Sequence, residues 1–177
     1  MSNKLNTYTV SIYTENNIGL LNRISAIFLK RHVNIESLTT SQSEIDNIYR
    51  FVIVVKVMES KIKNIIKQIE KQIEVIAAFY HTDKETIFLE TALYKVKSKS
   101  LFNEREIQNI IKESRANIVT VKPEYFVIEK TGWREETEEL YKKLKKHGLL
   151  QFVRSGRISV SKKSMEITKF LKSNKDE

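Results

Sequence analysis

Strand and helix patterns alternate along this chain in an order that occurs twice. The first occurrence reads β-α-β-β-α-β, with alternating or β-branched runs as strands and a three-four apolar spacing as helices. The expected strands cover residues 7–14, 33–40, 48–57 and 75–80, and the expected helices cover 18–31 and a segment that begins at Glu59 or Ser60. This order is typical of the ferredoxin-like arrangement, in which two helices cover one face of a four-stranded antiparallel sheet.

The same order returns in the second half of the chain. The expected strands here cover residues 87–96, 116–121, 125–130 and 149–154, with a short further strand at 157–160. Asn103-Glu104-Arg105-Glu106 has the form of a capping box that opens one helix, and residues 133–147 form the other. We therefore predict an α+β protein in which two ferredoxin-like βαββαβ domains follow each other in tandem, as an internal repeat of roughly 80 residues.

A polar stretch without periodicity, residues 81–86, marks the expected domain boundary. We expect a first domain over residues 1–82, a second over 83–162, and a basic, disordered tail over 163–177. In the first domain, Thr9, Ser11 and Tyr13 lie on the sheet face that the two helices leave uncovered. We expect that face, or a sheet edge, to be covered by another chain.

Composition limits the classes of function. The net charge of +9 raises the possibility of nucleic-acid binding, but the lysines alternate with glutamates as on solvated helix faces, and we expect no nucleic-acid partner. The absence of cysteine excludes disulfides and thiolate chemistry. No apolar run reaches the roughly 20 residues that a membrane span needs, and the first residues lack the apolar stretch of a signal peptide, so we expect a cytoplasmic protein without a membrane partner.

The junction between the first strand and the first helix has the composition of an anion site. Gly19 is expected in the first helical turn, where the free N–H groups and the helix dipole favour a carboxylate, and Ile18 and Leu21 are expected on the apolar side of the helix. Asn16 adds one amide and Asn34, at the start of the second strand, adds another. Two amides beside a glycine turn suit a small amino acid. The alternative is a plain helix cap in which Gly19 serves only close packing of the helix on the sheet.

Two segments here resemble a known family. Glu15-Asn16-Asn17-Ile18-Gly19-Leu20-Leu21, followed by Asn34-Ile35-Glu36-Ser37-Leu38, is similar to the amino-terminal ACT domain of the small, regulatory subunit of acetolactate synthase (acetohydroxyacid synthase). Ala116-Asn117-Ile118-Val119 and Phe152-Val153-Arg154-Ser155-Gly156-Arg157 fall where the second, ACT-like domain of that family has its counterparts. One departure is His32, at a position where many relatives have glycine.

The resemblance implies a ligand and two partners. It implies a homodimer through the ACT domains, with valine or another branched-chain amino acid bound between them. The ligand-binding residues that it implies are Asn16, Ile18, Gly19, Leu20, Leu21, Asn34 and Ile35, the last two contributed by the partner subunit. It also implies association with a large catalytic subunit that carries thiamine diphosphate, magnesium and FAD, converts pyruvate to 2-acetolactate, is activated by this chain, and becomes subject to feedback inhibition. No cofactor is expected on this chain itself.

The residues give no sign of catalysis by this chain alone. Nothing groups a nucleophile with a base, and the three histidines are scattered without carboxylates at metal-ligand spacing, so we expect no catalytic residue and no metal site. The main alternative to a regulatory subunit is a free-standing ACT-domain sensor of amino acids that acts on another target. The segment Arg154-Ser155-Gly156-Arg157 is open to two interpretations, a charged turn or a docking loop.

Overall fold

A computed structural model describes residues 4–99, 105–164 and 166–175. The chain forms two compact units, one of residues up to Ile87 together with those from Ser159 onward, and one of residues 88–158. The division between Ile87 and Phe88 lies next to the expected domain boundary at residues 81–86. The division between Ile158 and Ser159 differs from the expected end of the second domain at residue 162, because the end of the chain belongs to the first unit. No helix in the described part of the chain is long and apolar enough to cross a membrane.

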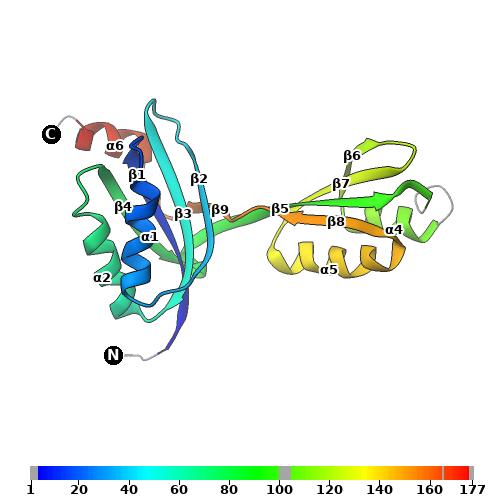
Figure 1. Cartoon of the computed structure of the whole chain (residues 1–177), viewed down its shortest axis with the longest axis horizontal. Coiled ribbons are helices and arrows are strands. Elements are labelled where there is room, and N and C mark those ends of the chain that lie inside the picture. The colour runs from blue at the N-terminus through cyan, green and yellow to red at the C-terminus, as the bar shows by residue number, and fades with distance from the viewer. Residues whose placement is uncertain (1–3, 100–104, 165, 176–177) are drawn as a thin grey trace. The chain divides into compact units, whose positions relative to one another are not determined.

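The first unit has the predicted order of elements (Figure 1). Its elements are β1 (Asn6–Glu15), α1 (Leu20–Lys30), β2 (Ile35–Gln42), β3 (Ile48–Val57), α2 (Glu59–Ile69) and β4 (Val75–Thr82). The strands form one sheet in the order β2-β3-β1-β4, and all neighbouring pairs are antiparallel. The predicted pairing of the second and third strands is confirmed, and so is the ferredoxin-like fold.

The core of this unit lies between one sheet face and the two helices. Alternate residues of β1, including Val10 and Ile12, pack against Ile24 and Phe28 of α1 and against the isoleucines of α2. The helix α1 begins two residues later than predicted, and its inward face starts at Leu20 instead of Ile18, which is fully exposed. Gly19 adopts a left-handed conformation and cannot belong to the helix, so the apolar face is rotated relative to the prediction.

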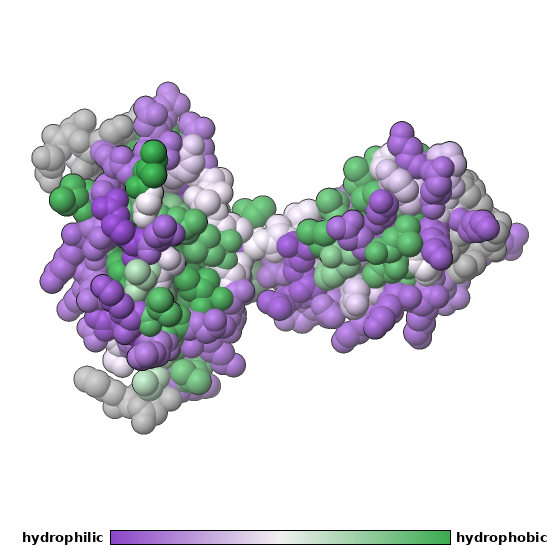
Figure 2. Space-filling model, in the orientation of Figure 1, coloured by the Kyte–Doolittle hydropathy of each residue, from purple (hydrophilic) through white to green (hydrophobic). Residues whose placement is uncertain are grey.

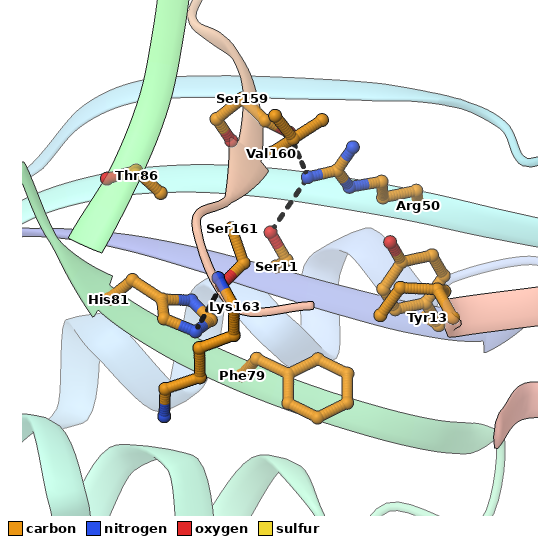
Figure 3. Close-up of a pocket in the computed structure, with 11 residues that line it drawn as sticks. Ser11, Tyr13, Arg50, Phe79, His81, Thr86, Ser159, Val160, Ser161 and Lys163 are labelled. Atoms are coloured by element: carbon orange, nitrogen blue, oxygen red, sulfur yellow. Dashed lines mark hydrogen bonds between the residues drawn. The ribbon is translucent and has the colours of Figure 1, made fainter. Parts of the chain in front are cut away.

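The second sheet face of this unit is covered by the end of the chain itself. Thr9, Ser11 and Tyr13 are all buried, and the elements β9 (Ile158–Ser161) and α6 (Ile167–Lys175) lie over Ser11 and Tyr13. Leu171 of α6 is fully buried in a cluster with Tyr13. In β3, Arg50 donates a hydrogen bond to the Ser159 carbonyl oxygen at 2.6 Å (Figure 3). The structure therefore corrects two expectations: residues 167–175 form a helix instead of a disordered tail, and the second face is not left open for another chain.

Hydrophobic side chains remain at one edge of the first unit. Among the described residues, β2 is an edge strand that pairs with β3 alone. Figure 2 shows hydrophobic residues gathered beside α1, over this edge. Ile27, Ile35 and Leu38 are only partly buried there. An edge strand with exposed apolar neighbours is a surface on which another strand can pair.

The second unit repeats the same topology. Its elements are β5 (Thr86–Lys97), α4 (Arg105–Glu113), β6 (Asn117–Val121), β7 (Tyr125–Gly132), α5 (Arg134–Leu144) and β8 (Leu149–Arg154), with the short 3-10 helices η1 (Asp83–Glu85) and η2 (Lys145–His147) preceding β5 and β8. The strand order is β6-β7-β5-β8, and β9 also pairs with β5. Tyr94, Phe126 and Ile128 of the sheet pack against Ile107 and Leu140 of the helices. The predicted capping box at residues 103–106 lies partly outside the described residues.

Candidate functional site

The turn between β1 and α1 leaves backbone donors pointing outward. Gly19 is the N-cap residue, with φ +83°, and no side chain in the part of the chain that the structure describes caps the helix by a hydrogen bond. The Leu20 N–H donates to the Asn17 carbonyl oxygen at 3.3 Å. The N–H groups of Leu21 and Asn22 follow in the first turn and have no acceptor within the helix. Together with the helix dipole they favour a bound anion.

These donors border a hollow of about 210 Å³. Its lining combines polar groups of the turn with the apolar side chains of Leu20, Tyr49 and Phe51. The full lining is Thr14, Glu15, Asn16, Asn17, Gly19, Leu20, Leu21, Thr40, Tyr49 and Phe51. We call this hollow the notch. It offers donors for a carboxylate at the helix start and an apolar wall for a short aliphatic side chain.

The notch contains a buried hydroxyl group that lacks a partner. Thr14 is fully buried, and its Oγ1 makes no hydrogen bond to any described residue. Leaving such a group unsatisfied costs about 1–3 kcal/mol, which a ligand that hydrogen-bonds to it would recover. Sequence reasoning missed Thr14, although a signal was present. Thr14 continues the inward series of Tyr8, Val10 and Ile12, where a polar residue is out of place.

The structure brings some of the predicted site residues together and leaves others apart. Asn16, Gly19, Leu20 and Leu21 line the notch, whereas Ile18 points to solvent and does not. Asn34 and Ile35 lie at the far end of β2: Ile35 pairs with Val55, while Thr40, which does line the notch, pairs with Phe51. Five residues of strand separate the two ends by about 16 Å. Within one chain, Asn34 and Ile35 therefore do not belong to this site.

The packing explanation for Gly19 is wrong. A Cβ atom built on Gly19 would meet nothing within 4 Å, so the helix does not need a glycine for close approach to the sheet. A glycine is favoured at this position because its φ is positive, a conformation that other L-residues adopt at a cost of about 1–2 kcal/mol.

Comparison with known proteins covers both units. Residues 10–77 match the family described as the AHAS small subunit-like ACT domain, and residues 89–163 match the small subunit of acetolactate synthase. The acetolactate synthase small subunit of Mycolicibacterium smegmatis is 35% identical over 162 residues, which are 92% of this chain and 95% of that protein. The chain belongs to the acetolactate synthase small-subunit family. The small subunit of Bacillus subtilis is likewise 35% identical, over 83% of this chain and 86% of its own.

A solved structure of the acetolactate synthase small subunit agrees with this fold. The small subunit from Thermotoga maritima superposes with a TM-score of 0.80 at 27% identity, over 90% of this chain and 99% of its own. The family resemblance that the sequence predicted is confirmed over both units. A free-standing ACT sensor would not need the second unit, so the match over residues 89–163 speaks against that alternative.

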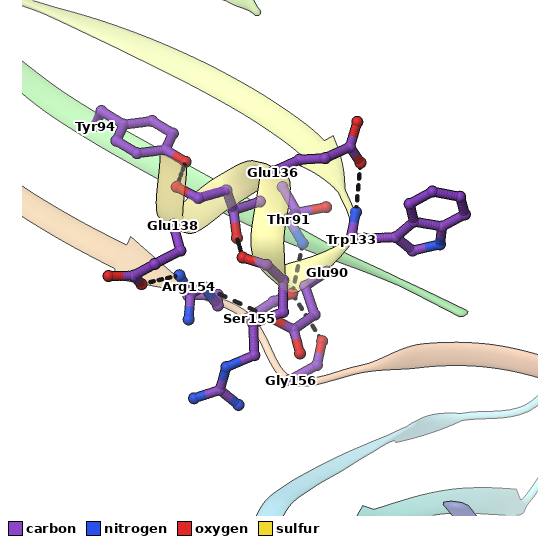
Figure 4. A network of polar contacts seen from close by, with 11 residues as sticks. Glu90, Thr91, Tyr94, Trp133, Glu136, Glu138, Arg154, Ser155 and Gly156 are labelled. Carbon is purple, nitrogen blue, oxygen red and sulfur yellow. Dashed lines mark hydrogen bonds and ion pairs between the residues drawn. The ribbon is translucent and has the colours of Figure 1, made fainter. Parts of the chain in front are cut away.

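In the second unit of this small subunit, Arg154 is held in a network of ion pairs (Figure 4). Its Nη2 donates to Glu138 at 2.8 Å, and its Nε lies 3.6 Å from a carboxylate oxygen of Glu90, which is buried. The hydrogen bond from Arg154 lowers the pKa of Glu138 below its usual range. Ser155 is tied to β5, because its N–H donates to the Thr91 carbonyl oxygen at 2.8 Å. These contacts favour the interpretation of residues 154–157 as a charged turn.

The described residues show no metal centre. No group of three or more His, Cys, Asp or Glu side chains in that part of the chain is placed to hold an ion. The candidate functional site is the notch, which combines N–H donors at a helix start with an apolar wall.

Proposed function

We propose that this small subunit binds valine, or another branched-chain amino acid, in the notch between the ACT domains of a homodimer. It associates in the cytoplasm with a large catalytic subunit that carries thiamine diphosphate, magnesium and FAD. It raises the activity of that subunit in forming 2-acetolactate from pyruvate and makes it sensitive to feedback inhibition. The chain itself performs no catalysis.

The geometry of β2 supports a notch shared by two chains. When two copies of an edge strand pair antiparallel about a two-fold axis, the start of one strand lies beside the end of the other. Thr40 near the end of β2 lines the notch, and Asn34 and Ile35 stand at its start. Such pairing brings Asn34 of the partner subunit to the notch that Asn34 of the same chain cannot reach. The partly buried apolar residues Ile35 and Leu38 of this strand favour the same pairing.

Each part of the ligand has a matching group. The carboxylate accepts from the N–H groups of Leu21 and Asn22 at the start of α1 and from the Thr14 hydroxyl. Asn16 and the partner's Asn34 provide amide oxygens for the ammonium group. The aliphatic side chain packs on Leu20, Tyr49 and Phe51, whose wall suits a short branched chain.

Feedback inhibition follows from differential affinity. The amino acid shifts the complex toward an inhibited arrangement only as far as it binds that arrangement more tightly than the active one. A difference of about 1–3 kcal/mol between the two arrangements is enough. Since the ligand lies between two chains, its binding changes how the two first units pair, and the complex responds to that change.

The buried, unpartnered hydroxyl of Thr14 beside an uncapped helix start is the observation that carries the proposal. The test assays acetolactate formation by the large subunit with this chain, with and without valine. We expect Asn16→Ala and Thr14→Val to raise the half-inhibitory valine concentration at least about tenfold, the effect of one hydrogen bond to a charged group, while activation is kept. Asn64→Ala, on the exposed side of α2, is the matched control and should behave as the natural chain.

Two results would count against the proposal in different ways. Unchanged inhibition in Asn16→Ala and Thr14→Val would remove the notch as the effector site. Activation of the large subunit without inhibition by any branched-chain amino acid would contradict the effector but retain the association of the two subunits.

A further inference from the structure

A second cavity lies within the first unit, on the opposite sheet face from the notch. It has a volume of about 180 Å³ and lies between the sheet and the returning end of the chain (Figure 3). Its lining is Ser11, Tyr13, Arg50, Phe79, His81, Thr86, Ser159, Val160, Ser161, Lys163 and Ile167. We call it the rear cavity. Tyr13 and Arg50 are register partners that face it, while their neighbours Thr14 and Tyr49 face the notch.

The charge of the rear cavity is positive. Arg50 and Lys163 line it, and none of its described lining residues is Asp or Glu. Burial lowers the pKa of His81, which favours the neutral imidazole, and the His81 Nε2 lies 3.3 Å from the Ser161 hydroxyl. The carboxylate that acts on His81 from nearby, Glu85, is held by the N–H of Thr82 at 2.8 Å.

Hydrogen-bonding groups in the rear cavity lack partners. Arg50 Nη2 donates to Ser11 Oγ at 3.1 Å and to the Ser159 carbonyl oxygen, but its buried Nε has no partner among the described residues. The hydroxyl of Ser159, a residue that is 2% exposed, likewise makes no hydrogen bond to any described residue. A guanidinium nitrogen that is buried without an acceptor is costly, and an anion that reached Arg50 Nε would offset that cost.

The other wall of the rear cavity is apolar. Phe79, Val160 and Ile167 contribute side chains without hydrogen-bonding groups. A cavity of this size, with cations and hydroxyl groups on one side and hydrocarbon on the other, matches a small molecule with one charged end and one apolar end. The volume is far below the range of about 300–1,000 Å³ that is typical of sites for larger ligands.

We propose that the rear cavity binds a short aliphatic carboxylate. Its carboxylate accepts from Arg50 Nε and the Ser159 hydroxyl, the exposed Lys163 adds positive charge at the rim of the cavity, and the hydrocarbon part contacts Phe79, Val160 and Ile167. This site is separate from the notch and does not depend on the function proposed above.

The test titrates the full-length protein with sodium isobutyrate and follows the backbone amide signals by NMR. We expect saturable shifts at Ser11, Arg50, Ser159 and Ser161, and no response to isobutyramide, the uncharged analogue. Arg50→Gln should weaken binding at least about tenfold, as the loss of a hydrogen bond to a charged group does. Lys163→Gln, an exposed position that leaves the fold intact, should weaken it about two- to fivefold. Arg134→Gln, the same change at an exposed site of the second unit, is the control and should bind as the natural chain.

Four results would overturn the proposal. Isobutyramide could bind as well as isobutyrate, or the shifts could be confined to the notch around Gly19 and Leu21. Inorganic phosphate could bind where isobutyrate does not, which would contradict an aliphatic carboxylate. Lys163→Gln and Arg50→Gln could both bind isobutyrate as Arg134→Gln does, which would exclude the two cations from the site.

Discussion

At the scale of single residues, two left-handed positions set the limits of α1. Gly19 precedes the helix with φ +83°, and His32 follows it with φ +51°. Glycine adopts this conformation freely, which explains why the turn at Gly19 can present its backbone to a ligand. His32 adopts it against the steric preference of a side chain. Histidine instead of glycine at position 32 therefore lowers the free energy of unfolding.

We predict that His32→Gly stabilises the protein. Relief of the left-handed strain should raise the free energy of unfolding by about 1 kcal/mol, after allowance for the greater freedom of glycine in the unfolded chain. Lys30→Gly, inside the last turn of α1, is the control and should lower it by about 1 kcal/mol. Urea denaturation measures both. Equal destabilisation by the two glycines would show that His32 is not strained.

The sequence predicted some of the residues that line the notch and did not predict others. Asn16 and Gly19 were predicted as site residues from a glycine turn between a strand and a helix together with the family resemblance, and the structure places both in the lining of the notch. Ile18 was placed wrongly on the inner side of the helix, since periodicity alone cannot tell where a helix begins when the N-cap residue is left-handed. Thr14 was missed because an unsatisfied hydroxyl is a property of three-dimensional packing, which one strand does not reveal.

At the scale of elements, α6 is the main difference between prediction and structure. The order of helices and strands along both units followed from apolar periodicity, because each element carries its own local pattern. The last residues were predicted disordered from their lysines, yet Ile167, Phe170 and Leu171 have helical spacing and pack on the sheet. These side chains pack against Tyr13 and Ile48, which are more than a hundred residues away in the sequence. No local pattern could therefore identify this segment as a packed helix.

We predict that Leu171→Ala destabilises the first unit. Leu171 is fully buried, and the loss of a buried leucine side chain costs about 2–5 kcal/mol. Leu29→Ala is the matched control, because Leu29 is 74% exposed and its loss should change little. Thermal unfolding followed by circular dichroism compares the two. The packing of α6 on the sheet would be contradicted if both variants unfolded at the temperature of the natural chain.

The network around Arg154 gives a prediction for the second unit. Arg154→Ala removes the cation that faces the buried Glu90 and should destabilise this unit by about 3–5 kcal/mol, because the carboxylate is left without a partner. Arg134→Ala, the loss of an exposed arginine at the start of α5, is the control and should have little effect. Chemical denaturation measures both variants. A docking role for residues 154–157 would instead leave stability unchanged and weaken binding to the large subunit.

At the scale of the whole molecule, the proposed function requires two chains to form one site. Asn34 and Ile35 lie about 16 Å from the notch of their own chain. If a second chain supplies them, the amino acid binds the dimer and not the monomer. Linkage then demands that valine and dimerisation strengthen each other.

We predict that valine tightens the dimer. Valine at a hundred times its dissociation constant stabilises the dimer by about 2.7 kcal/mol for each notch that it fills. Sedimentation equilibrium, at concentrations where monomer and dimer coexist, measures the shift. Asn34→Ala should keep the dimerisation constant of the natural chain without valine and lose most of the shift with valine, whereas the exposed Asn64→Ala should keep both. A valine affinity that is the same for monomer and dimer would mean that the notch is complete within one chain, and the shared site would have to be abandoned.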